Sequence, residues 1–162
     1  MYKWIHGICA AVLFVATPAV LAGEYPAGCL PKNVEFQGDN VVLGTVPSSE
    51  VYRVYVFGNT ASEPVQVDHG LPPEDLKARI WTTQLEPEHW SAVLVPETNF
   101  AMTCKQNIGD LWTSVACKDV LKVCELRVSE VMLSSRGGYW ITQNQRDQTE
   151  LFSWIRFQGI YP

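Results

Sequence analysis

The sequence predicts a mainly β protein built as an antiparallel sandwich, with an immunoglobulin-like arrangement as the most specific architecture that it supports. Short runs rich in β-branched and aromatic residues alternate with turn residues along most of the chain. Helical periodicity is confined to the C-terminal segment, so a parallel sheet with crossover helices is not indicated. The expected strands cover residues 41–43, 51–57, 65–68, 79–85, 90–95, 100–104, 120–128 and 139–142.

Length and composition are those of about one globular domain. The chain has 162 residues, of which 47% are hydrophobic, 18% are charged and 11% are aromatic. This composition excludes a disordered or collagen-like polypeptide, and the chain is long enough to bury a core of its own.

The clearest strand is predicted for residues 51–57, where apolar and aromatic side chains occupy successive positions. That pattern indicates that both faces of the strand are covered. Residues 58–64 are typical of a turn, and the next alternating run covers residues 65–68. We therefore expect these two strands to form a β-hairpin.

A helix is predicted near the C-terminus. Asp147 is a suitable N-cap with Glu150 three residues further on, which is the spacing of a capping box, and Gly159 is a suitable stop. The apolar stripe expected to face the core consists of Leu151, Phe152, Trp154 and Ile155.

Residues 1–22 have the features of a cleaved export signal. Lys3 precedes an apolar stretch at residues 8–15, Pro18 follows, and the segment ends in the small residue Ala22. Cleavage leaves residues 23–162 as a single disulfide-stabilised β domain. Because Lys3 is the only Lys, Arg, Asp or Glu removed, the formal charge changes from −5 to −6. This acidic balance argues against nucleic acid as a partner.

Two other interpretations of the N-terminal region remain open. An uncleaved membrane anchor needs about 20 apolar residues, and this segment is interrupted by His6 and Pro18. Lipidation would occur at Cys29, after Ala27 and Gly28, but Pro26 stands where leucine is expected. We therefore expect a periplasmic or outer-membrane-associated protein, or a secreted one, without a transmembrane segment after cleavage of the signal.

Four cysteines remain after the signal, and an even set in an exported chain predicts two disulfides. They are Cys29, Cys104, Cys117 and Cys124. On a helix Cys117 and Cys124 would be roughly 10 Å apart, and further on one strand, which disfavours a bond between them. Two pairings stay open: Cys29–Cys124 with Cys104–Cys117, or Cys29–Cys117 with Cys104–Cys124.

No catalytic, metal or cofactor site is predicted. The two histidines of the exported chain, His69 and His89, are expected to serve turns, although acidic neighbours could in principle complete a metal site if the turns met. A nucleophile elbow, a phosphate-binding loop and a paired-cysteine redox motif are all absent from the sequence. We therefore expect a protein that is not an enzyme and needs no cofactor.

Tryptophan is the unusual component of the exported chain. We expect the side chains of Trp90 and Trp154 to lie in the core. Trp112 is expected in a loop bounded by Cys104 and Cys117, where a disulfide could hold an aromatic side chain outward for binding. The alternative, that Trp112 and its neighbour fold back as a plug over the sandwich end, is the one that the sequence favours. The candidate binding residues are Trp112, Leu111, Tyr139 and Trp140.

Four segments of the chain carry a resemblance to a known family. They are residues 88–95, 99–104, 115–124 and 138–144, and their most specific feature is the placement of Trp90 and the three later cysteines. In these segments the chain resembles the small exported enhanced-entry protein B family of bacteria that use a Dot/Icm type IVB secretion system. The resemblance implies no catalytic residue, and it implies a role in host entry or in the outer-membrane core complex of that system.

Two classes of function follow from these observations. The first is a non-enzymatic interaction module in the bacterial envelope, with protein partners, and the sequence favours it. The second is a small cell-wall glycan-binding protein or hydrolase. Facing carboxylates in a cleft, or a row of coplanar tryptophans, would indicate the second class, and an apolar patch near an edge strand would indicate the first.

Overall fold

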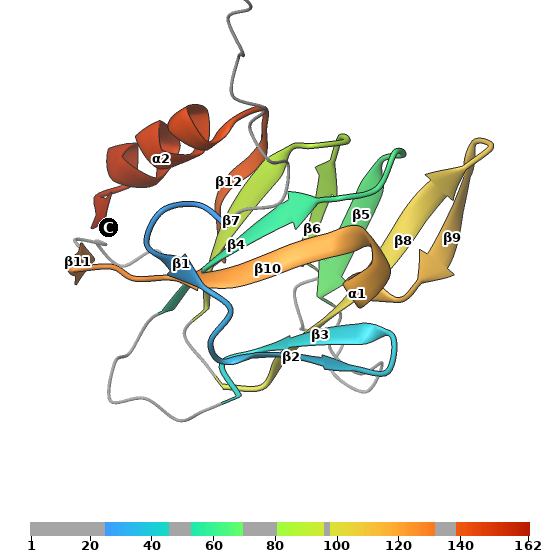
Figure 1. Cartoon of the computed structure of the whole chain (residues 1–162), viewed down its shortest axis with the longest axis horizontal. Helices are drawn as coiled ribbons and strands as arrows, with labels where there is room; N and C mark the ends of the chain where they lie inside the picture. The colour runs from blue at the N-terminus through green and yellow to red at the C-terminus, as the bar shows by residue number, and fades with distance from the viewer. Residues whose placement is uncertain (1–24, 46–52, 70–80, 96–97, 132–138) are drawn as a thin grey trace, which may run out of the picture.

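The computed structural model describes residues 25–45, 53–69, 81–95, 98–131 and 139–162 (Figure 1). Two antiparallel sheets pack face to face, and a ten-residue helix lies near the C-terminus. The predicted mainly β sandwich with a short C-terminal helix is therefore confirmed. The predicted signal, residues 1–22, lies outside the described residues, as do the first two residues of the strand predicted at 51–57.

The first sheet has five strands. In spatial order they are β1 (Cys29–Leu30), β10 (Leu121–Leu126), β4 (Arg53–Asn59), β7 (Trp90–Val95) and β12 (Tyr139–Gln145).

The second sheet has six strands. In order they are β2 (Val34–Gln37), β3 (Asn40–Leu43), β8 (Phe100–Ile108), β5 (Val65–His69) and β6 (Trp81–Leu85), with β9 (Leu111–Val115) paired to the later part of β8. The remaining elements are α1 (Cys117–Val120), α2 (Gln148–Phe157) and the short ladder of β11 (Glu130–Val131) with β13 (Ile160–Tyr161).

The path of the chain repeats one step three times. After β1, after β4 and after β7, the chain leaves the first sheet, forms an antiparallel pair in the second sheet and returns. The pairs are β2 with β3, β5 with β6, and β8 with β9. This order differs from the four-plus-three strand order of an immunoglobulin constant domain, although both are antiparallel sandwiches.

The predicted hairpin of β4 with β5 is wrong, because the two strands lie in different sheets. β4 is flanked by β10 and β7, whereas β5 is flanked by β6 and β8. The chain leaves the first sheet at Asn59, whose amide nitrogen donates to the carbonyl oxygens of Leu85 at 2.9 Å and Glu63 at 3.0 Å. The buried bond to Leu85, which belongs to β6, holds the end of β4 against the second sheet.

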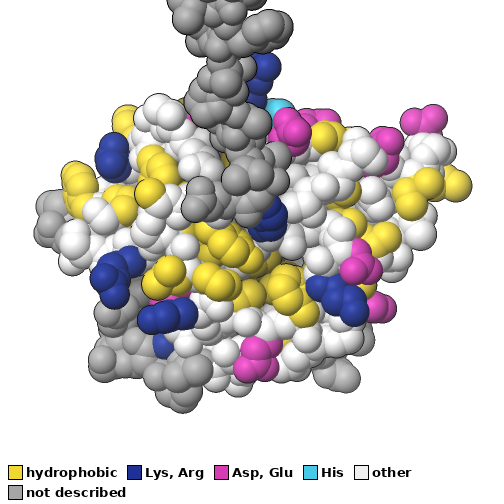
Figure 2. Space-filling model, viewed as in Figure 1, with side chains coloured by type: hydrophobic (Ala, Val, Ile, Leu, Met, Phe, Trp, Pro, Cys, Tyr) yellow, Lys and Arg dark blue, Asp and Glu magenta, His cyan; other side chains and the backbone are white. Residues whose placement is uncertain are grey.

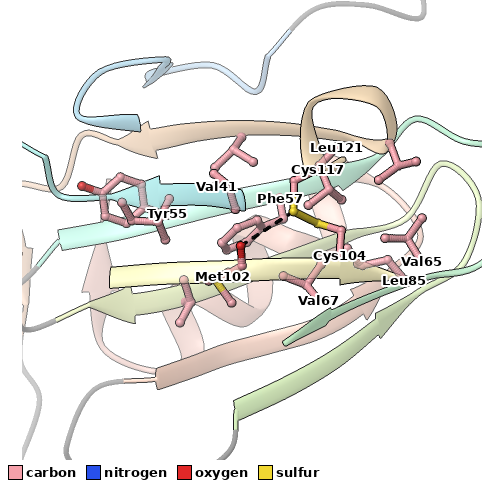
Figure 3. Packing of buried hydrophobic residues seen from close by; sticks show 14 of the residues in the cluster. Val41, Tyr55, Phe57, Val65, Val67, Leu85, Met102, Cys104, Cys117 and Leu121 are labelled. Carbon is pink, nitrogen blue, oxygen red and sulfur yellow. Dashed lines mark hydrogen bonds between the residues drawn. A yellow bond between two sulfur atoms is a disulfide. The ribbon is translucent and has the colours of Figure 1, made fainter. Parts of the chain in front are cut away.

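The first sheet is buried on both faces, as the pattern of β4 predicts. Tyr55 and Phe57 enter the core between the two sheets, where residues of β3, β5, β8 and β10 surround them (Figure 3). Val54 and Val56 enter a second core on the opposite face, which Leu151 of α2 closes together with the C-terminal strand. The molecule therefore has three layers: the second sheet, the first sheet, and α2.

The structure selects one of the two open disulfide pairings. Cys29 is bonded to Cys124 and Cys104 to Cys117, with Cα–Cα distances of 5.5 and 5.2 Å. The Cys104–Cys117 bond lies in the core between the sheets (Figure 3). The Cys29 sulfur is committed to a disulfide here, so it is not available for the thioether that lipidation requires.

The predicted helix is confirmed over Gln148–Phe157. The backbone N–H of Glu150 donates to Asp147 Oδ1 at 2.8 Å, and Glu150 Oε2 accepts from the backbone N–H of Arg146 at 2.9 Å. In a capping box the Glu side chain accepts from the backbone N–H of the N-cap residue itself. Here Glu150 accepts instead from Arg146, one residue before the N-cap Asp147. Gly159 has a φ of 78°, a conformation that suits a residue without a Cβ.

Loss of the Cys29–Cys124 bond should cost more stability than loss of the Cys104–Cys117 bond. The sequence separations are 95 and 13 residues, so the first bond closes a much longer loop in the unfolded chain. For loops of these sizes the chain-entropy relation gives about 4–5 and about 3 kcal/mol. Denaturant unfolding of two double variants, each with one cysteine pair replaced by serine, measures the difference. Equal losses, or the reverse order, would contradict it.

The close packing of Gly58 against Trp90 is a second stability test. A Cβ built at Gly58 would lie 2.6 Å from Cζ3 of the Trp90 ring, so Gly58→Ala forces the ring to move. We expect a loss of about 1–3 kcal/mol in the free energy of unfolding. Trp90→Leu removes the clash, so the double variant should lose less than the sum of the single losses. If the losses in free energy of unfolding of the two single variants add in the double variant, contact with the Trp90 ring is not the reason that alanine destabilises position 58.

Candidate functional site

The main candidate surface is the β8–β9 hairpin, which projects at one end of the second sheet (Figure 1). We expected residues 111–115 to belong to a loop, but they form a strand. Gly109 and Asp110 both have positive φ, 57° and 67°, as a two-residue turn of type I′ requires. The Gly-Asp pair between two apolar residues was the signal in the sequence that indicates this turn.

The tip of this hairpin, residues 107–112, exposes large apolar side chains. The exposed fractions are 52% for Ile108, 71% for Leu111 and 37% for Trp112, and hydrophobic side chains are visible at this end of the molecule in Figure 2. Leu111 therefore does not act as a plug over the sandwich. Trp112 is also exposed, which argues against the plug that the sequence favoured, and its role in recognition stays a prediction.

The apolar side chains of the hairpin tip lie on both of its faces. Ile108 pairs with Leu111, and Asn107 pairs with Trp112, so side-chain alternation places the two pairs on opposite faces. Cys104, which points into the core, shares the face of Ile108. A protein that binds this tip could therefore contact apolar groups on both sides.

The base of the hairpin is covalently fixed. Cys104 of β8 is opposite Val115 of β9, and two residues later Cys117 is bonded to Cys104. The Cys117 Sγ also lies 3.8 Å from the carbonyl oxygen of Met102. Since a two-stranded hairpin is only marginally stable alone, this bond helps β9 to keep its structure while its side chains are exposed.

The other two predicted binding residues do not join this surface. Trp140 is half-buried and packs against the core, with its ring edge-to-face to Phe57 at 5.9 Å. It therefore packs against the core, and its role in binding stays a prediction. The backbone of Tyr139 pairs with Leu94, and its side chain lies outside the described residues.

Two aromatic side chains are also exposed on α2, and their exposure was not predicted from the sequence. The expectation that Trp154 serves the core is wrong, because its side chain is 44% exposed. The helix instead buries Leu151 and Ile155, which puts Trp154 and Phe157 on the outer face. Their rings meet edge-to-face at 83°, so they do not form the flat shelf on which a sugar ring stacks.

A polar cluster surrounds Arg53 at the start of β4. Arg53 is 7% exposed, and its Nε lies 4.0 Å from the Glu125 carboxylate. Glu125 also accepts a bond from the side-chain amide of Asn33 at 2.5 Å. Burial raises the pKa of the Tyr55 phenol, an effect that the Glu125 carboxylate reinforces and that Arg53 opposes.

The histidines bind backbone carbonyl groups. His69 Nδ1 is 2.5 Å from the oxygen of Ala101, and the ring stacks on Phe100 with 3.6 Å between the ring centroids. His89 Nδ1 is 2.9 Å from the oxygen of Pro87. In the part of the chain that is described, no three His, Cys, Asp or Glu side chains gather in a way that could hold a metal ion.

Comparison with protein-family models, with curated proteins and with solved structures finds no match to this chain. The resemblance to the enhanced-entry protein B family therefore stays a prediction. Across the described residues, no helix combines the length and the apolar character needed to cross a bilayer.

The fold should lose stability in acid through Asp68. Burial alone would raise the pKa of this carboxyl, but hydrogen bonds from Thr82, Lys105 and Gln66 outweigh that effect and lower it. A lowered pKa in the folded state stabilises the fold above about pH 4, the value in the unfolded chain. That contribution is lost as the pH falls from there through the folded-state pKa.

Urea unfolding of the wild type and of Asp68→Asn between pH 7 and pH 2 tests this. The wild type should be the more stable protein at pH 7, and the difference should shrink below about pH 4. A difference that stays constant over the whole range would exclude a contribution from the ionised carboxylate.

Proposed function

We propose that this chain is an exported, non-enzymatic interaction module of the bacterial envelope, and that the β8–β9 hairpin is its contact surface for a protein partner. The observation that carries the proposal is the hairpin tip, where Ile108, Leu111 and Trp112 are exposed on a covalently anchored strand pair. Aromatic and large aliphatic side chains on a rigid support are the groups that dominate binding energy at protein interfaces.

The outer edge of β9 supports the same proposal. Among the described strands, β9 pairs with β8 alone, and every residue from Leu111 to Ser114 is exposed. Proteins usually protect such an edge with charged residues or proline, but β9 has neither. An extended segment of a partner could add to this edge through main-chain hydrogen bonds, while its side chains contact the apolar tip.

Two disulfides support an oxidising location, since such bonds persist in the periplasm and outside the cell. Together with the signal-like residues 1–22 they favour a periplasmic or outer-membrane-associated protein. The resemblance of the segments around Trp90 and the later cysteines then suggests a more specific role. In that role the chain is an accessory subunit of a Dot/Icm type IVB outer-membrane core complex, or a factor in host entry.

Trp112→Ala should weaken binding to the envelope partner without unfolding the protein. For a central aromatic residue we expect a loss of about 2 kcal/mol or more, which is roughly 30-fold in affinity. The melting temperature should change little, because the side chain is exposed. Ser114→Lys, which adds a charge to the β9 edge, should also weaken binding if a partner strand pairs there.

Affinity purification of each tagged variant from envelope fractions, followed by quantitative mass spectrometry and thermal melting, makes the measurement. Trp154→Ala is the matched control, because it removes an exposed tryptophan from α2 and should leave the captured partner unchanged. If Trp112→Ala is destabilised while its folded fraction captures the partner normally, the hairpin is not the contact surface.

A further inference from the structure

A pocket of about 190 Å³ lies where the β1–β2 connection passes the end of β10. Its apolar wall comes from Leu30, Leu126 and Val128. Small-molecule sites usually have volumes of roughly 300–1,000 Å³, so this pocket suits one small chemical group instead of an extended ligand.

The charged side chains of this pocket are mostly basic. Lys32, Arg53 and Arg127 line it together with one acid, Glu125, although the chain as a whole has a formal charge of −5. Figure 2 shows Lys and Arg side chains gathered on the lower left, over the end of β10 and the start of β2. The charge of the pocket is thus opposite in sign to the net charge of the chain.

The three cations occupy two depths. Arg53 is buried at the base and is held by Glu125 and by the Tyr55 phenol, so its positive charge has a fixed position. Lys32 and Arg127 are exposed. The ion pairs among the described residues are Arg53–Glu125 and Lys105–Asp68, so neither exposed cation is paired with a described acid.

We propose that this pocket binds a single carboxylate that carries a small apolar group, as in the C-terminal residue of a peptide. The guanidinium group of an arginine such as Arg53 forms strong, directional bonds with a carboxylate. The exposed cations Lys32 and Arg127 attract an anion to the entrance. Leu30, Leu126 and Val128 provide the contact for the apolar group. The site does not include the β8–β9 hairpin, so it does not depend on the function proposed above.

Glu125, the acidic residue of the pocket lining, determines which kind of anion fits best. Glu125 neutralises part of the charge of Arg53 and would repel the second negative charge of a phosphate dianion. A monoanion avoids most of that repulsion. The apolar wall also gives an organic acid a contact that inorganic phosphate lacks, so both features favour a monocarboxylate.

NMR titration of the oxidised, exported protein with N-acetyl-leucine at low ionic strength tests the proposal. We expect saturable shifts of the backbone amides of Leu30, Lys32, Asn33 and residues 125–128, with a Kd on the order of 1 mM that weakens as salt is added. N-acetyl-leucinamide, which lacks the carboxylate, should not produce these shifts. Binding of the amide with equal affinity, or no shifts with the acid, would overturn the proposal.

The double variant Lys32→Gln/Arg127→Gln should bind N-acetyl-leucine roughly five- to tenfold more weakly, with an unchanged fold because both side chains are exposed. Lys118→Gln/Arg156→Gln is the matched control, since it removes the same charge from exposed positions that do not line the pocket and should bind normally. Equal weakening in both variants would show that only the net charge matters, and this would overturn the site.

Two further probes distinguish the source of the carboxylate. A tripeptide that ends in leucine with a free carboxylate should bind more tightly than hexanoate if the natural ligand is a chain terminus. The reverse order would assign the same pocket to a free aliphatic acid. Inorganic phosphate that binds as tightly as N-acetyl-leucine would overturn the preference for a carboxylate.

Discussion

The fold depends on one constraint, which is that the first sheet is buried on both faces. Its central strand β4 places Tyr55 and Phe57 in the core against the second sheet, and Val54 and Val56 in the core beneath α2. All seven residues of this strand are buried. Such a strand cannot alternate apolar with polar side chains, because neither of its faces meets water. The two outer layers can therefore be held together only through this sheet.

This burial has a consequence for the polar residues at the two ends of β4. Asn59 is 3% exposed, and its side chain donates two hydrogen bonds while its oxygen accepts one from the Ala61 N–H. Arg53, at the other end, is neutralised by Glu125. Since an unpaired buried polar group is costly, both ends need specific partners, and each end has one from a distant segment: Leu85 for Asn59 and Glu125 for Arg53. The partners of Asn59 direct the chain into the second sheet. Glu125, the partner of Arg53, forms with it the base of the proposed carboxylate pocket.

Local signals were sufficient for some elements and insufficient for others. The helix α2 was predictable because Asp147 and Gly159 act on neighbouring backbone groups. The strand β9 was also within reach, because Gly109 and Asp110 form its turn, but it was interpreted as a loop. The partner of β4 was not predictable, since strand pairing is decided by non-local packing. The same holds for the pocket, whose charged residues come from three segments that only the folded sheet brings together.

The two proposed sites lie at opposite ends of one short, doubly anchored segment. Cys117 begins α1 at the base of the hairpin, and Cys124 lies on β10 next to Glu125 of the pocket. The segment between these cysteines passes from the second sheet to the first and buries Val120, Leu121 and other apolar residues in the central core. Reduction of either bond would release one end of it. The two disulfides therefore do more than stabilise the fold: they keep the hairpin and the pocket each beside a fixed covalent anchor, so that both surfaces are already ordered before a ligand binds.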